Sequence, residues 1–149
     1  MSLGGGDSQL QELAQQLEAL EQQREALEAE VEGLQAEKQE INEAIEAIEE
    51  LESGATVQVP VGGDAYIRAE IENIDEVVVA LGGGYAAERN QEGAISTLET
   101  KQDTLDDRIE DVRSEIAELE TETEELEKRA QQLQTQQMQQ MQQQQQPDE

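Results

Sequence analysis

The feature that most constrains the fold of this chain is a heptad seam that occurs twice. Over residues 8–53 and again over residues 91–137, apolar side chains recur at alternating steps of three and four. This spacing keeps them on one stripe of a helix and is typical of a coiled coil. The sequence therefore predicts two long helices over these ranges. The first seam holds Leu10, Leu13, Leu17, Leu20, Arg24, Leu27, Val31, Leu34, Lys38, Ile41, Ile45 and Ile48, and the second holds Ile95, Leu98, Gln102, Leu105, Ile109, Val112, Ile116, Leu119, Thr123, Leu126, Ala130 and Leu133.

The two seams match each other as an antiparallel pair. If the second helix folds back on the first, each layer joins residues whose numbers have the same sum, so that Leu10 faces Leu133 and Arg24 faces Leu119. The aliphatic stem of Arg24 can then lie along the leucine while its guanidinium reaches water. The pattern predicts a helical hairpin but leaves its register open by one heptad.

Local signals mark the ends of both helices. Asp7 or Ser8 can cap the start of the first helix, and Ser53-Gly54 can end it. Asn90 is a suitable N-cap for the second helix, because its side chain can accept a bond from an unpaired backbone N–H.

Residues 54–90 have a different character from the helical runs. Short segments rich in β-branched residues are separated by glycine turns, a pattern that predicts strands and hairpins. The predicted fold class is α+β, with a long antiparallel two-helix coiled coil and two β-hairpins inserted between the helices. The four predicted strands are 56–60, 65–71, 76–81 and 85–89, and the turns contain Gly62-Gly63 and Gly82-Gly84.

The predicted strands carry an apolar face that we expect to serve assembly. Four short strands bury too little surface to be stable alone, and open sheet edges are prone to pairing. The chain outside the strands offers no cover for this face, so we expect the same sheet in other subunits to cover it and form a β-built oligomeric core. The oligomerisation residues expected on this face are Val57, Val59, Ile67, Ile71, Val77 and Val79.

Both chain ends have a biased composition. Residues 1–7 are glycine-rich and are predicted to be a flexible N-terminus. Residues 138–149 complete a glutamine-rich run and are predicted to form a disordered tail. A substrate-contacting role for this tail is the alternative.

The charge of the chain limits its partners and its location. There are 37 acidic and 9 basic residues, a net charge of −28, which repels phosphate backbones and anionic membranes. No run of about 18 apolar residues is present, and the N-terminus does not resemble a signal peptide, so we expect a soluble, cytoplasmic protein. The acidity fits a protein from a halophile, or an acidic coiled coil from an ordinary cell.

Composition also disfavours an enzyme. The chain contains no Cys and no His, and it has only 1% aromatic residues, so it offers little material for a catalytic pocket. The glycine triplets lack the ending of a phosphate-binding loop, and the acidic residues lack the spacing of a calcium loop. We therefore expect no catalytic residue, no cofactor and no metal site.

The central segment resembles the prefoldin family, and in detail its α class, which has two hairpins. The resemblance rests on VQVPVGGDAYIRAEI (57–71), EVVVALGGGYAAER (76–89) and EGAISTLE (92–99), and it extends over about residues 8–133. It implies an ATP-independent archaeal chaperone subunit. It further implies a hexamer of two α and four β subunits, in which the sheets form an oligomeric β-barrel base. The hexamer is expected to hold non-native proteins between its coiled-coil arms and deliver them to a group II chaperonin.

The client-binding region implied by this resemblance is the tip of the helical hairpin. Exposed leucines and adaptable methionines there could contact many sequences. Ordinary coiled-coil packing of the leucines is the competing interpretation. A structural spacer without clients, or an acidic mimic of nucleic acid, is the alternative function. The candidate client-binding residues are Leu3, Leu10, Leu13, Leu17, Leu126, Leu133, Met138 and Met141.

Overall fold

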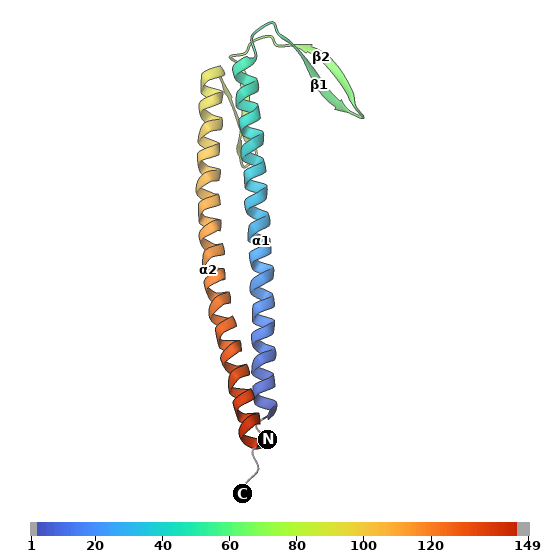
Figure 1. Ribbon diagram of the computed structural model, residues 1–149. Coiled ribbons are helices and arrows are strands. Elements are labelled where there is room, and N and C mark those ends of the chain that lie inside the picture. Colours follow the sequence, from blue (N-terminus) through green and yellow to red (C-terminus); the bar gives the residue numbers. More distant parts are fainter. Residues whose placement is uncertain (1–2, 146–149) are drawn as a thin grey trace. The chain divides into compact units, whose positions relative to one another are not determined.

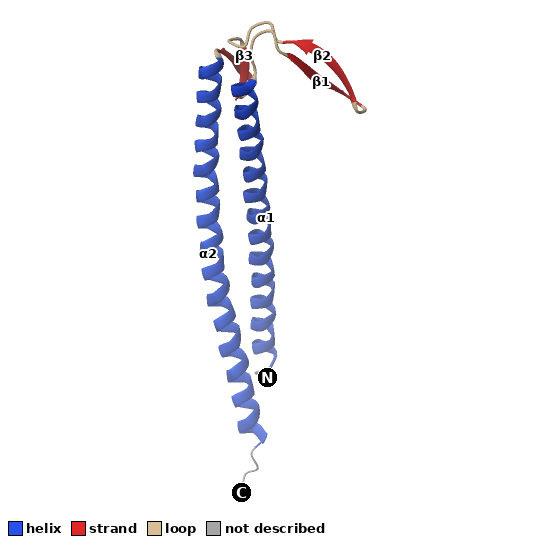
Figure 2. Cartoon of the chain, turned by 45° about the horizontal axis from the view of Figure 1, so that its top comes forward, coloured by secondary structure: helices blue, strands red, loops and turns tan. Residues whose placement is uncertain are grey.

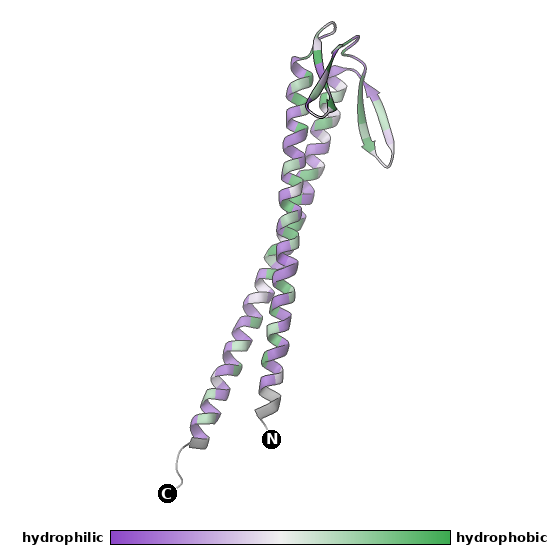
Figure 3. Ribbon diagram, turned by 90° about the vertical axis from the view of Figure 1, so that its right-hand side faces the viewer, coloured by the Kyte–Doolittle hydropathy of each residue, from purple (hydrophilic) through white to green (hydrophobic). Residues whose placement is uncertain are grey.

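Two helices and four strands make up the computed structural model, which describes residues 3–145 (Figure 1). The order along the chain is helix, two β-hairpins, helix, so the predicted fold class is confirmed (Figure 2). Hydrophobic positions recur at intervals along both helices, as a heptad seam requires (Figure 3). The elements are α1 (Leu3–Glu50), β1 (Thr56–Gly62), β2 (Ala65–Glu70), β3 (Val77–Gly82), β4 (Tyr85–Arg89) and α2 (Gln91–Gln145).

Both helices extend beyond the predicted bounds at the chain ends. α1 begins at Leu3, within the segment predicted to be flexible, so Asp7 and Ser8 lie inside the helix and not at its N-cap. α2 continues to Gln145 through most of the segment predicted to be disordered. Glutamine is a good helix former, and no Pro or Gly interrupts the run before Pro147. At its other end α1 stops at Glu50, three residues before the predicted end at residue 53.

The described residues form two compact units. One, here called the terminal unit, contains the segments before Gly33 and after Arg108. The other, the hairpin unit, spans Gly33–Arg108 and contains all four strands.

Within each unit the helical segments are antiparallel (Figure 1). In the hairpin unit Lys38 bonds to Asp106, which adjoins its predicted partner Leu105. This contact confirms the predicted register there and excludes a slip of one heptad within the hairpin unit.

The strands form two separate two-stranded sheets, and the described residues contain no closed barrel. In the first sheet Val57 pairs with Ala69 and Val59 with Ile67. In the second sheet Val77 pairs with Arg89 and Val79 with Ala87.

Both hairpins close through two-residue turns with left-handed backbone. The turn residues are Gly63-Asp64, with φ of 58° and 60°, and Gly83-Gly84, with φ of 62° and 83°. Such turns match the right-handed twist of the strands that they connect, which explains the glycines between the predicted strands.

The hydrophobic core of the hairpin unit joins the helices to the second sheet. Its buried members are Ile41 and Ile45 from α1, Ala94 and Leu98 from α2, and Val79 from β3. In the terminal unit Ile109 and Val112 are buried in the seam, and Val112 is fully enclosed. No helix in residues 3–145 is long and apolar enough to cross a membrane.

Candidate functional site

The second hairpin uses its predicted assembly face inside its own chain. Val79 is only 5% exposed and packs in the core of the hairpin unit, and Val77 packs against the same core. The expectation that the chain offers no cover for these two residues is therefore wrong. Ala94 is fully buried beside them, and its small side chain lets the strand approach the helix. The neighbouring Val78, on the opposite face of β3, is 69% exposed.

The first hairpin leaves its apolar face open. Val59 is 44% exposed, and its cross-strand partner Ile67 is 58% exposed. Val57 and Ile71 are half-buried. Ile71 also lengthens the sheet, since its N–H donates to the carbonyl of Ala55. These four residues remain as the candidate assembly surface.

The junction of β4 and α2 is fixed by side-chain hydrogen bonds. The Oδ1 atom of Asn90 accepts a bond of 2.7 Å from the N–H of Gly93, which confirms Asn90 as the N-cap of α2. Gln91 donates from Nε2 to the carbonyls of Ile48 (2.7 Å) and Leu51 (3.2 Å), just at and after the end of α1. This cross-helix cap was missed from the sequence, because nothing in the pattern indicates which residue reaches the end of α1.

The candidate client-binding leucines mostly belong to the coiled-coil seam. Leu13 is 7% exposed, and it lines a groove of the terminal unit together with Leu133. The others with described side chains are half-buried, namely Leu10, Leu17, Leu126 and Leu133. The side chain of Leu3 lies outside the described residues. Packing against the facing helix therefore accounts for most of these leucines.

The two methionines differ from the leucines. Met138 is 67% exposed and Met141 is 56% exposed, and both lie near the end of α2 in the terminal unit. In Figure 3 the two helices of this unit separate toward the chain termini. Among the described side chains of the terminal unit, Met138 and Met141 are thus the exposed large apolar groups.

Arg24 occupies a seam position of the terminal unit, and its guanidinium contacts carboxylates of its own helix. Its guanidinium hydrogen-bonds and pairs with Glu21, and Glu28 lies 3.9 Å from its Nε atom. The hydrogen bond that Arg24 donates to the Glu21 carboxylate raises the pKa of Arg24 above its already high usual value. The side chain therefore stays charged, and the seam has an ionic layer at this position.

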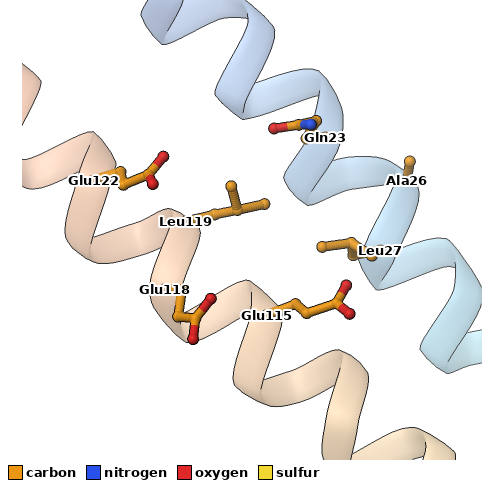
Figure 4. A pocket seen from close by; sticks show the side chains of 7 residues that line it. All are labelled: Gln23, Ala26, Leu27, Glu115, Glu118, Leu119 and Glu122. Carbon is orange, nitrogen blue, oxygen red and sulfur yellow. The ribbon is translucent and has the colours of Figure 1, made fainter.

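A groove beside this ionic layer was also missed from the sequence. It has a volume of about 340 Å³ and lies between α1 and α2 within the terminal unit. Figure 4 shows Leu27 and Leu119 pointing toward one another from the two helices, with Glu115, Glu118 and Glu122 on the α2 side. Heptad analysis places the two leucines in the seam and gives no sign that a hollow remains between them.

The acidic residues show no arrangement for a metal ion in the part of the chain that the structure describes. The architecture is thus that of a helical hairpin with inserted β-hairpins and open apolar surfaces, a class of binding and assembly proteins. A family model described as Prefoldin, prefoldin subunit, matches residues 20–146. The chain belongs to the prefoldin subunit family, which is a family of chaperones.

Similar relatives come mostly from halophilic archaea. The chain is 68% identical over 113 residues to prefoldin subunit alpha of Haloarcula marismortui, with 76% of this chain and 73% of the relative covered. Identity to prefoldin subunit alpha of Halobacterium salinarum is also 68% over 113 residues, covering 75% and 73%. The cryo-EM structure of filamentous PFD from Methanocaldococcus jannaschii matches with a TM-score of 0.68 and 30% identity, covering 76% of this chain and 96% of that one.

Proposed function

We propose that this chain is a subunit of an ATP-independent holdase, which captures non-native proteins at the terminal end of its helical hairpin and delivers them to a group II chaperonin. The observation that carries the proposal is the exposure of Met138 and Met141 near the end of α2. Methionine has a flexible, polarisable side chain that adapts to irregular apolar surfaces, so it suits the binding of many unrelated sequences. Family membership supports the chaperone role.

We further propose that the chain works in the cytoplasm in a hetero-hexamer of two such subunits and four β-type subunits. Support comes from the open apolar face of the first hairpin, formed by Val57, Val59, Ile67 and Ile71. A two-stranded sheet with one bare apolar face is marginally stable alone, and equivalent hairpins of neighbouring subunits would cover it.

A structural spacer is the second candidate. The burial of Leu13 and the half-burial of the other seam leucines favour it, because these side chains already have partners in the coiled coil. A spacer would assemble through its hairpins and would not hold clients.

The test is light scattering from a refolding client in about 1 M salt without ATP, with a β-type subunit present. Two variants are compared with the full chain: the Met138→Gln/Met141→Gln double substitution and a chain trimmed to residues 18–125. The Gln139→Asn/Gln142→Asn double substitution is the matched control, since both residues are exposed on the same helical segment. Size-exclusion chromatography first establishes that each variant assembles.

Loss of at least half of the suppression in the methionine variant, with the control unchanged, supports capture by these residues. Loss in the trimmed chain alone keeps capture at the terminal end but removes it from the methionines. If no assembled form suppresses aggregation, the spacer becomes the better description.

A further inference from the structure

The groove beside Arg24 has the features of a binding site that client capture at the chain termini does not require. Its apolar floor is formed by Ala26, Leu27 and Leu119, and its acidic rim by Glu115, Glu118 and Glu122. We refer to this site as the flank groove. In Figure 4 the floor leucines face each other while the three glutamates all project from α2.

We propose that the flank groove binds a basic amphipathic segment of a partner protein. Lysine or arginine side chains of that segment would lay their aliphatic stems on the floor and place their charges at the rim. The proposal goes beyond the proposed function, because the site lies in the seam and not among the exposed methionines.

The seam sequence explains why a hollow is present here. Arg24 stands where the heptad pattern calls for a leucine, and it directs its guanidinium toward Glu21 and Glu28 of its own helix. Its head group therefore does not fill the space between the helices as a leucine would. The next seam residue along α1, Leu27, is only half-buried, as is Leu119 of α2. Both leucines keep apolar surface that a ligand can cover.

The rim carboxylates lack a cation within the described residues. Arg24 pairs with Glu21 and Glu28 of its own helix, and Lys38 pairs with Asp106, so neither of these cations neutralises the rim. α1 contributes Gln23 and Ala26 to the groove, and neither carries charge. Carboxylates flanking a seam are commonly matched by basic residues on the facing helix. Here that complement is missing, and a partner with positive charge would supply it.

The spacing of the rim defines the shape of the expected ligand. The three glutamates follow each other at steps of three and four, so they lie on one face of α2 over about 10 Å. A short helix or strand that carries a leucine with one basic residue on each side of it would span this distance. Lysine and arginine stems bury well on apolar surface while their charges stay hydrated. Acidic or phosphate-bearing ligands would be repelled.

The overall charge of the chain supplies the competing explanation, since a net charge of −28 attracts any cationic peptide. Salt separates the two effects, because the Debye length falls to about 3 Å at 1 M. Long-range attraction then disappears, while contact with an apolar floor persists. Binding specific to the flank groove must therefore survive in about 1 M potassium chloride.

The experiment uses the full-length chain and a fluorescein-labelled synthetic helical peptide with two lysines flanking a leucine, one turn to either side. Fluorescence anisotropy gives its dissociation constant in about 1 M potassium chloride, which tests the apolar floor, and in about 0.1 M potassium chloride, which tests the charged rim. The rim variant is Glu115→Gln/Glu118→Gln/Glu122→Gln. The matched control, Glu110→Gln/Glu124→Gln/Glu127→Gln, removes the same charge at exposed positions of α2 that do not line the groove.

A third variant fills the groove without changing its charge. Ala26 is exposed and lines the floor, so Ala26→Leu places extra side-chain atoms in the hollow while retaining a good helix former. Circular dichroism confirms that each variant keeps its helices, which separates loss of the site from loss of the fold.

In about 1 M potassium chloride we expect Ala26→Leu to weaken peptide binding about tenfold or more. In about 0.1 M potassium chloride, where the Debye length is about 10 Å and the rim charges still act, we expect the rim variant to weaken binding about tenfold and the control variant less than twofold. Equal weakening by the rim and control variants would overturn the proposal in favour of general attraction. In about 1 M potassium chloride, unchanged binding in Ala26→Leu or no measurable binding by the unmodified chain would overturn it as well.

Discussion

Lys38 of α1 donates a hydrogen bond from Nζ to Oδ1 of Asp106 in α2, and the two residues form an ion pair across the helices of the hairpin unit. The backbone carbonyl of Lys38 also accepts a bond of 3.3 Å from the Nε2 atom of Gln102. The polar side chains of two seam residues, Lys38 and Gln102, thus have hydrogen-bond partners on the facing helix. Arg24, in the terminal unit, pairs instead with carboxylates of its own helix.

The Lys38–Asp106 pair should contribute little to the free energy of unfolding, and only at low salt. Both side chains are partly exposed, at 34% and 53%, and exposed ion pairs contribute about 0.2–1 kcal/mol. We expect Asp106→Asn to lower the free energy of unfolding by no more than about 1 kcal/mol in low salt and to have no effect near 1 M salt. Urea unfolding at the two salt concentrations measures this, since urea adds no ions. Asp103→Asn is the control, because Asp103 is exposed and has no ion pair in the described residues; an equal loss there would refute the role of the pair.

The two faces of β3 should differ sharply in their effect on stability. Val79 is 5% exposed and Val78 is 69% exposed, so only Val79→Ala leaves a cavity in the core. We expect Val79→Ala to lower the free energy of unfolding by about 2 kcal/mol and Val78→Ala by less than about 0.5 kcal/mol. Urea unfolding of the chain without partner subunits compares them. Similar losses in both variants would mean that β3 does not pack on the helices through Val79.

The stability that the Asn90 N-cap gives to α2 should depend on the glycine at position 93. A Cβ atom at this glycine would lie 2.7 Å from Oδ1 of Asn90, so Gly93→Ala displaces the capping side chain. We expect Asn90→Ala to cost about 1 kcal/mol in the unmodified chain. Gly93→Ala should be nearly neutral, since a gain of about 1 kcal/mol in helix propensity offsets the lost cap.

In the Gly93→Ala background, Asn90→Ala should then cost almost nothing. A double-mutant cycle of unfolding free energies measures this coupling. Additive effects of the two substitutions would show that the cap survives the methyl group.

Gln91 should stabilise the end of α1 although it belongs to α2. Its side chain serves the carbonyls of Ile48 and Leu51, and Gln91→Met keeps its length while removing the donor. We expect Gln91→Met to lower the free energy of unfolding by about 1–2 kcal/mol, because the partly buried carbonyls would lack hydrogen-bond partners. Gln39→Met, at an exposed position of α1, serves as the control and should stay within about 0.5 kcal/mol. Hydrogen exchange that increases in the last turn of α1 only for Gln91→Met would locate the effect.

The sequence by itself determined the helices, their antiparallel pairing and the hairpin turns. A seam such as that from Ile41 to Ile48 is a local pattern, and its period specifies a coiled coil wherever the helix lies. The cap at Asn90 and the left-handed turns at Gly63 and Gly83 are likewise set by residues only a few positions apart.

Only the tertiary structure decided which strand faces are covered and where the hollows remain. Val77, Val78 and Val79 are all apolar, so the strand shows no alternation, and the packed helices select Val79 as the buried residue and leave Val78 outside. The reach of Gln91 to Ile48 and the hollow between Leu27 and Leu119 likewise depend on side chains far apart in the chain. Periodicity specifies the face of one element, whereas burial depends on the shape of whatever packs against that face.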